Sequence, residues 1–214
     1  MTREPAHEPS PEGPTQTLRD EPGGWPVVGS TDLHRDDWVI AFRLDLVHPP
    51  GGEPGAAFPR LVLEHPGAVV VLAVDADERV LCLRQYRHAL GGRYVELPAG
   101  LCDVPGEDPL EVARRELVEE AHLAAREWAH LLTVRASPGV SDEVVHLYLA
   151  RRLTEVDPGD FEPEHEEAHM ETFWAPFDDL LRAVLEGHVT EAPIALALLV
   201  AQARGLAGGA TSSV

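Results

Sequence analysis

The sequence GLCDVPGEDPLEVARRELVEEAHL at Gly100–Leu123 determines how the whole chain is interpreted. Asp108 is a favoured N-cap residue and a proline follows it, so we expect a helix over residues 109–121. Glu116 and Glu120 lie one turn apart on this helix, and like charges at that spacing destabilise it by roughly 0.2–0.5 kcal/mol. A hard divalent cation such as Mg²⁺ or Mn²⁺ would compensate by binding the carboxylate oxygens. The alternative is an acidic face that is only solvated.

Apolar runs on both sides of this helix indicate a fold of mixed strands and helices. The run 68–74 is followed by a turn at 75–78 and then by 80–86, which predicts a hairpin. We expect strands at residues 38–47, 60–64, 68–74, 80–86, 128–134, 144–150 and 172–174, and closing helices at 177–186 and 192–204.

Composition divides the chain into four parts. Residues 1–24 are rich in Pro and Glu and poor in large apolar groups, which predicts a disordered arm. We expect a small β domain at 25–65, a main α+β domain at 66–206 and a flexible tail at 207–214. A β unit of this size is too small to be stable alone.

Charge limits the possible partners. The 214 residues carry a formal net charge of −20, from 37 acidic and 17 basic side chains. Such a field argues against binding to a nucleic-acid backbone or to an anionic membrane. Cys82 and Cys102 lack the spacing of a metal or redox motif, and the longest apolar run is only strand-length, so we expect a cytoplasmic protein. A phosphorylated small molecule would need a cation between itself and these acidic groups.

The stretch from Gly100 resembles the Nudix box, whose pattern is GX5EX7REUXEEXGU with U aliphatic. Six residues rather than five separate Gly100 from Glu107, and His122 stands where the pattern has its second glycine. The longer loop leaves the helix spacing intact. We expect His122 to end the helix in a left-handed backbone conformation. The matching residues are Gly100, Glu107, Arg115, Glu116, Leu117, Glu119, Glu120 and Leu123.

Within the Nudix family the chain is similar to the ADP-ribose pyrophosphatases, especially the actinobacterial type, over residues 25–205. The similarity rests on residues 85–88, 96–100, 138–143 and 166–170, and on the closing helices. It implies an α+β fold in which an α/β/α sandwich surrounds a mixed sheet, preceded by a small N-terminal β domain that is exchanged in a homodimer. It also implies that ADP-ribose is hydrolysed to AMP and ribose 5-phosphate with Mg²⁺ or Mn²⁺.

The resemblance assigns the metal site to the acidic helix and the segment before it. It implies metal binding by Glu116, Glu120 and the carbonyl oxygen of Ala99, with Glu119 close by. Arg115 is expected to orient the glutamates rather than to contact the substrate.

The resemblance also implies a catalytic base on the loop before the last strand. The candidates are Glu167 and its neighbour Glu166, either of which could accept the proton of the attacking water. Related proteins read EEADM here, and His169 replaces the Asp in this chain. Glu143, just after a Pro-Gly turn, either supports the site or only begins a strand.

Four further residues are candidates for substrate binding. Arg87 follows a core strand and is either a clamp for a phosphate or part of a surface ion pair. Trp38, Arg43 and Glu96 either contact the nucleoside across a dimer or have roles in the core or on a sheet face.

Other functions fit parts of the sequence. The segment His165–His169 matches H-E-x-x-H, the zinc-peptidase helix signature, but Pro163 and an acidic run precede it and no apolar periodicity surrounds it. A non-catalytic Nudix regulator would add a DNA-binding module, for which the chain has no basic patch. Another nucleoside diphosphate derivative remains open as the substrate, because the box indicates diphosphate chemistry and says little about the leaving groups.

Overall fold

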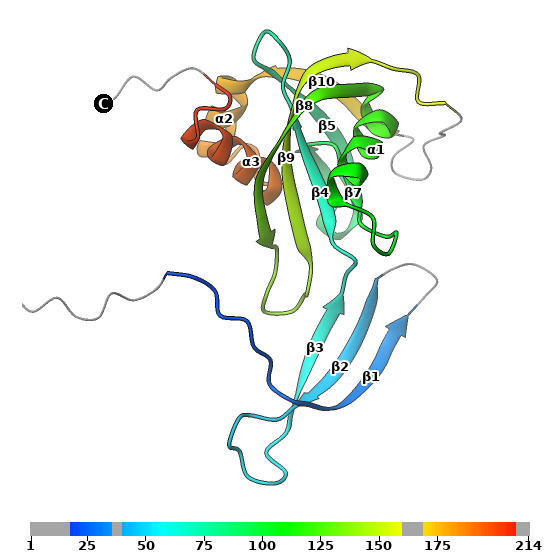
Figure 1. The fold of residues 1–214 in the computed structure, drawn as a ribbon, viewed down its shortest axis with the longest axis vertical. Helices are drawn as coiled ribbons and strands as arrows, with labels where there is room; N and C mark the ends of the chain where they lie inside the picture. Colours follow the sequence, from blue (N-terminus) through cyan, green and yellow to red (C-terminus); the bar gives the residue numbers. More distant parts are fainter. Residues whose placement is uncertain (1–17, 36–39, 160–168, 209–214) are drawn as a thin grey trace, which may run out of the picture.

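The computed structural model describes residues 18–35, 40–159 and 169–208. An N-terminal sheet forms a separate lobe, drawn below the rest of the molecule in Figure 1. Its antiparallel strands are β1 (Val27–Arg35), β2 (Ala41–Val47) and β3 (Phe58–Glu64), in that order. The expected β unit is therefore present, and it contains a strand, β1, that the sequence did not predict because Gly29 and polar residues interrupt its apolar pattern.

Two further sheets make up the main part of the molecule. In the four-stranded sheet the order is β7-β4-β9-β8, and β4 (Ala68–Ala73) runs parallel to β9 (Val144–Glu155). Strand β7 (Ala99–Leu101) pairs antiparallel with β4, and β8 (Leu123–Arg135) pairs antiparallel with β9. The three-stranded antiparallel sheet has the order β10-β5-β6, formed by β5 (Arg79–Arg87), β6 (Gly92–Glu96) and β10 (Glu171–Pro176). The expected mixed sheet is confirmed.

Helices cover both faces of the four-stranded sheet (Figure 1). On one face lies α1 (Pro109–Ala121), and on the other lie α2 (Phe177–Leu185) and α3 (Ala192–Ala203). A short 3₁₀ helix, η1 (His88–Leu90), follows β5. The α/β/α sandwich is therefore confirmed, and the three predicted helices lie within one residue of their expected bounds.

The continuous apolar run of β4 is explained by burial on both faces, since successive strand residues point to opposite sides of a sheet. One set of its side chains packs toward α2 and α3, and the alternate set packs toward α1. The first set is Val70 and Leu72, and the second is Val69, Val71 and Ala73.

The predicted hairpin between residues 68–74 and 80–86 is wrong. Its turn does form, because the Asp75 N–H donates to the Arg79 carbonyl at 3.0 Å and a bridge joins Val74 to Val80. Beyond that bridge the strands separate into different sheets: β4 pairs with β7 and β9, and β5 pairs with β6 and β10. Strand β4 and residues 80–83 of β5 are buried on both faces, so their apolar pattern does not specify a partner.

The main differences from the predicted boundaries are in β8, in β9 and at the C-terminal end. Strands β8 and β9 are longer than the expected 128–134 and 144–150. The two strands continue past the sheet as an antiparallel ribbon, in which Leu123 of β8 pairs with Glu155 of β9. The packed chain extends beyond residue 206, since Ala207 is buried and the Gly208 N–H donates to a Glu78 carboxylate oxygen at 3.1 Å. The arm expected at 1–24 lies mostly outside the described residues.

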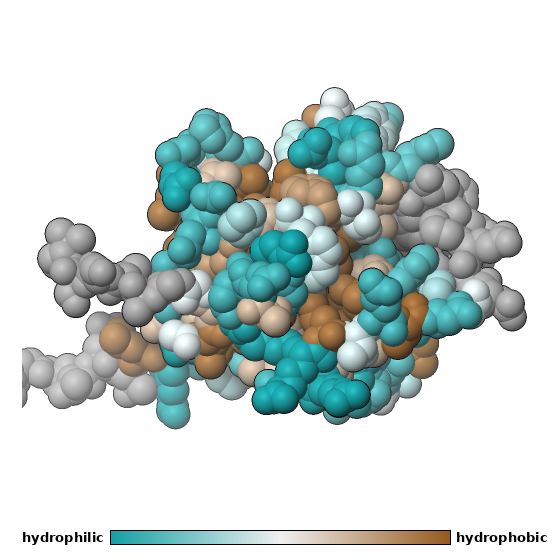
Figure 2. All heavy atoms as spheres, turned by 90° about the horizontal axis from the view of Figure 1, so that it is seen from above, coloured by the Kyte–Doolittle hydropathy of each residue, from teal (hydrophilic) through white to brown (hydrophobic). Residues whose placement is uncertain are grey.

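On the end of the molecule shown in Figure 2, hydrophilic and hydrophobic residues are interspersed. No helix within the described ranges is both long enough and apolar enough to cross a membrane.

Candidate active site

Helix α1 begins and ends as its sequence requires. The Asp108 side chain accepts a hydrogen bond from the Leu110 N–H at 2.9 Å, with Pro109 at the first helical position. The helix ends at His122, which has φ 54° and ψ 36° and donates its N–H to the carbonyls of Leu117 and Val118. The expected left-handed conformation of His122 is therefore confirmed.

Two carboxylates of α1 lie against strand β7. The Glu120 Oε2 atom accepts a hydrogen bond from the Ala99 N–H at 2.8 Å. A Cβ atom added to Gly100 would lie only 2.0 Å from Cδ of Glu116, so glycine is required there by the close approach of this carboxylate. Gly100 thus packs with Glu116, and strand β7 with Glu116 and Glu120, two of the box glutamates.

Arg115 lies among the acidic residues of the same region. Its Nη1 atom is 2.8 Å from Oε1 of Glu116 and 3.3 Å from Oε2 of Glu119. Burial alone would lower the pKa of Arg115, but Glu116, Glu119 and other nearby carboxylates raise it above its ordinary value. Arg115 stays charged and contacts the glutamates that the resemblance expects it to orient.

A cavity of about 980 Å³ opens beside these residues. Among the described side chains that line it, seven are carboxylates and two are guanidiniums. An anionic ligand would therefore meet strong repulsion unless a cation came with it. The carboxylates are Glu96, Asp103, Glu116, Glu119, Glu120, Glu143 and Glu191, and the guanidiniums are Arg87 and Arg115.

The two substrate-binding candidates in the cavity pair with each other. The Arg87 Nε atom donates to Glu96 Oε1 at 2.9 Å and a second nitrogen donates to Oε2, which makes the pair bidentate. Glu96 is buried, and its hydrogen bonds to Arg87 raise the pKa of the guanidinium. Arg87 therefore forms an ion pair, as one of the two interpretations expected, and the pair lies in the lining of the cavity.

Arg43 is not among the residues that line this cavity. It lies on β2, where its Nε atom is 3.1 Å from Oδ2 of the buried Asp45, and it also pairs with Glu64. This contact set is that of a sheet-face residue within the N-terminal lobe. Trp38, Glu166 and Glu167 lie outside the described residues, as does His165 of the H-E-x-x-H match.

Glu191 and His65 also line the cavity, and neither was identified as a site residue from the sequence. Glu191 is the N-cap of α3, and its Oε2 atom accepts a hydrogen bond from the Ile194 N–H at 2.8 Å. Burial raises the pKa of Glu191 to about 7, with smaller contributions from nearby carboxylates. His65 lies in the link from β3 to β4. The acidic N-cap before Pro193 was a usable signal for Glu191, whereas no motif marks His65.

The donor chemistry of the site fits a hard divalent cation, although its carboxylates are at present engaged within the protein. No group of three potential metal-binding side chains converges within the described part of the chain. Glu107 Oε2 is buried without a hydrogen-bond partner there and is 3.9 Å from the nearest Arg115 nitrogen. Arg115 also contacts Glu116 and Glu119, and a buried carboxylate oxygen without a hydrogen bond near these residues is the sort of environment that a cation stabilises.

The sandwich, the glutamates of α1 against β7 and the acidic cavity together define a hydrolase of the Nudix class. The NUDIX domain model matches residues 64–197, which is more than half of the sequence, and the chain belongs to this family.

Relatives and a solved structure agree with this assignment. The chain is 43% identical over 175 residues to an ADP-ribose pyrophosphatase of Mycobacterium tuberculosis, covering 82% of this chain and 81% of that protein. It is 33% identical to an ADP-ribose pyrophosphatase of Bacillus subtilis, covering 75% and 83%. A crystal structure of an ADP compounds hydrolase, 20% identical, superposes with a TM-score of 0.68 over 88% of this chain and 100% of that one, and it shares the fold.

Proposed function

We propose that this Nudix hydrolase cleaves the diphosphate of ADP-ribose to AMP and ribose 5-phosphate, using Mg²⁺ or Mn²⁺. The observation that carries the substrate is the 43% identity to an ADP-ribose pyrophosphatase across four-fifths of both proteins. The cavity supports the reaction class, because it is large enough for a dinucleotide-sized ligand and is lined by Glu116, Glu119 and Glu120 of the box.

Glu116, Glu120 and the Ala99 carbonyl would hold the cation. Nudix hydrolases generally need divalent metal ions, which neutralise the negative charge of a diphosphate and lower the pKa of a bound water. Gly100 allows Glu116 to approach β7 closely, and Arg115 restrains Glu116 and Glu119 through ion pairs. These contacts fix the carboxylates before the substrate arrives.

Arg87 and Glu96 would bind the substrate as a pair. Glu96 holds the guanidinium in a bidentate contact, so Arg87 is pre-oriented toward the cavity, and its charge offsets part of the surrounding acidity. A diphosphate oxygen accepts from such a guanidinium, which is one of only two in the described lining.

The base remains a prediction from the sequence. A carboxylate at Glu167 or Glu166 would accept a proton from the attacking water, an effect that contributes about 10²–10⁴-fold. Glu143 lines the cavity and is the alternative within the described residues.

We also propose that the protein is a homodimer. One face of the N-terminal sheet is apolar, and its Phe42, Leu46 and Leu61 are 41%, 41% and 43% exposed. The opposite face carries the ion pairs of Arg43. A second copy would cover the apolar face, and the exchanged lobe could then bring Arg43 and Trp38 to a nucleoside. Light scattering should give twice the monomer mass, and Leu46→Glu should reduce it.

A cytoplasmic location is consistent with the cysteines, since Cys82 and Cys102 are both free thiols.

The central experiment incubates the protein with ADP-ribose and other nucleoside diphosphate derivatives, with and without Mg²⁺ or Mn²⁺, and separates the products by chromatography. We expect AMP and ribose 5-phosphate only when metal is present. Glu120→Gln should abolish most turnover, whereas Glu111→Gln, an exposed control on the same helix that pairs with Arg114, should not. Equal turnover of Glu120→Gln and wild type would refute the metal assignment.

Further outcomes test the substrate and the catalytic base separately. If ADP-ribose is inert while another dinucleotide is cleaved, the substrate proposal is wrong and the diphosphate chemistry stands. For the base, Glu167→Gln should lower kcat with little change in substrate binding, and an unchanged kcat would move the role to Glu166 or Glu143.

A further inference from the structure

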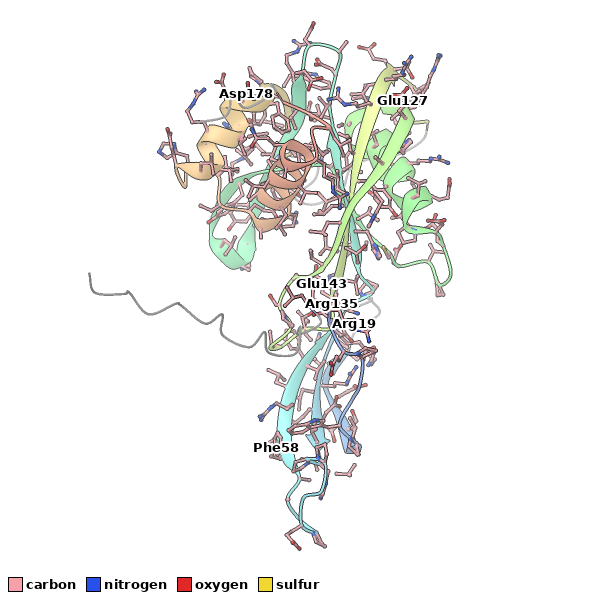
Figure 3. The ribbon with its side chains drawn as sticks, turned by 60° about the vertical axis from the view of Figure 1, so that its left-hand side comes forward. Arg19, Phe58, Glu127, Arg135, Glu143 and Asp178 are labelled. Carbon is pink, nitrogen blue, oxygen red and sulfur yellow. The ribbon has the colours of Figure 1, made fainter. Side chains whose placement is uncertain are left out.

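His65 lies at the junction of the two lobes and reaches the active-site cavity. It directly follows β3, two residues separate it from β4, and its side chain is 10% exposed. The ring lines the cavity beside Glu143, which belongs to the segment between β8 and β9. Figure 3 shows Glu143 at the level where the N-terminal lobe meets the rest of the molecule.

The hydrogen bond at one ring nitrogen fixes the proton on the other. The Gly67 N–H donates to Nδ1 of His65 at 3.1 Å, so Nδ1 must be an acceptor and the ring hydrogen is on Nε2. Gly67 can place its N–H there because its φ is +96°, a backbone conformation that residues other than glycine rarely adopt. The Nε2–H group is consequently a fixed donor.

This donor faces an acceptor at a distance that one hydroxyl group can bridge. Nε2 of His65 is 3.9 Å from Oε1 of Glu143, which is too far for a direct hydrogen bond. An oxygen atom placed to one side of this gap can lie about 2.8 Å from both atoms. A hydroxyl both donates and accepts, so it satisfies the imidazole and the carboxylate together, whereas a phosphate oxygen would be repelled by Glu143.

Backbone hydrogen bonds hold the two side chains in this relation. The His65 N–H donates to Oδ1 of Asp142 at 2.8 Å, and the Leu63 N–H donates to the Val140 carbonyl at 2.7 Å. The segment that carries Glu143 is thereby joined to the end of β3. These hydrogen bonds restrain the pair before any ligand binds, which favours recognition.

We propose that His65 is a specificity-determining residue, which with Glu143 binds one hydroxyl of the terminal ribose of the substrate. This inference rests on the proposed hydrolysis of ADP-ribose. Of the substrate's parts, its sugars supply neutral hydroxyl groups. If the exchanged lobe of the proposed dimer holds the nucleoside, the terminal ribose is the sugar that remains for this cavity.

The test uses two substitutions that divide the functions of the ring. His65→Asn keeps an acceptor for the Gly67 N–H and removes the donor at the position of Nε2, and His65→Gln keeps a donor near that position. With Mg²⁺ and ADP-ribose, we expect kcat/KM to fall about tenfold for His65→Asn, as for one lost hydrogen bond, and to recover largely for His65→Gln. Combining His65→Asn with Glu143→Ala should cost less than the product of the two single effects.

Substrate analogues make the test specific. Among ADP-ribose analogues that each lack one hydroxyl of the terminal ribose, one should be cleaved about tenfold more slowly by the wild type and at nearly the same rate as ADP-ribose by His65→Asn. A purely structural role predicts instead a lower melting temperature in both His65 variants, with no analogue singled out, and that result would overturn the inference. No turnover of ADP-ribose by the wild type would refute the proposed function itself, and with it this inference.

Discussion

Replacing Glu191 with glutamine is expected to stabilise the protein more at pH 8 than at pH 5. Burial, with Glu96 and Glu143 nearby, raises the pKa of Glu191 from 4.5 to about 7, although the Ile194 N–H and Arg87 favour the ionised form. Since one pKa unit corresponds to about 1.4 kcal/mol, ionising this carboxyl costs the folded state up to about 3.5 kcal/mol more than the unfolded chain.

The sign of the pH dependence follows from the direction of the shift. Below about pH 4.5 the Glu191 carboxyl is protonated in both states, and the bound proton makes its full contribution to stability. Between pH 4.5 and 7 the unfolded chain loses the proton first, so rising pH favours unfolding. Above pH 7 the carboxyl is ionised in both states, and the loss of folding stability is complete. Partial exposure of the side chain reduces the effect to about 2 kcal/mol.

Urea unfolding of wild type and Glu191→Gln at pH 5 and pH 8 measures this difference. The glutamine oxygen can still accept from the Ile194 N–H, so the helix cap is kept. The gain in free energy of unfolding should be about 2 kcal/mol larger at pH 8 than at pH 5. Glu155→Gln, at an exposed position of β9, is the control and should show no such difference. Equal gains for Glu191→Gln at the two pH values would refute the reasoning.

Three other substitutions test contacts described above. Gly100→Ala should lower kcat about 100-fold, because the new Cβ displaces the Glu116 carboxylate. A circular dichroism melt should show that the variant is still folded at the assay temperature, so that unfolding does not explain the lost activity. His122→Gly should raise the free energy of unfolding in urea by about 1 kcal/mol by relieving the left-handed backbone; an unchanged value would mean that His122 is not strained. Arg87→Lys keeps the charge but loses the bidentate contact with Glu96, so KM for ADP-ribose should rise about tenfold, and an unaltered KM would remove Arg87 from substrate binding.

The fold could be predicted from the sequence where local rules decide it. Asp108 and the proline after it set the start of α1, and His122 marked its end despite replacing a glycine. Pairing between distant strands could not be predicted in this way. The β4 run is equally apolar on both faces, and its parallel partner β9 begins some seventy residues later, at Val144. The short strand β7 was missed because Pro98 and Gly100 make its sequence resemble a loop.

For the candidate site too, local spacing was predictable from the sequence and tertiary contacts were not. Spacing along one helix was enough to bring Glu116, Glu119 and Glu120 together, because a helix repeats every 3.6 residues. The contact of Arg87 with Glu96 depends on how β5 and β6 pair, and neither residue belongs to a motif that states its partner. His65 joins the cavity only through the tertiary placement of the link between the lobes, so no pattern in the sequence could indicate it.

The joint between β3 and the segment before Glu143 also has a consequence for dynamics. The amides of Leu63, His65 and Asp142 all donate across this joint, so they protect one another from solvent. If the joint opens as one cooperative unit, these three amides should exchange their hydrogens at a common rate. Slow opening of the N-terminal lobe and loss of the geometry around Glu143 would then be a single event on the same timescale.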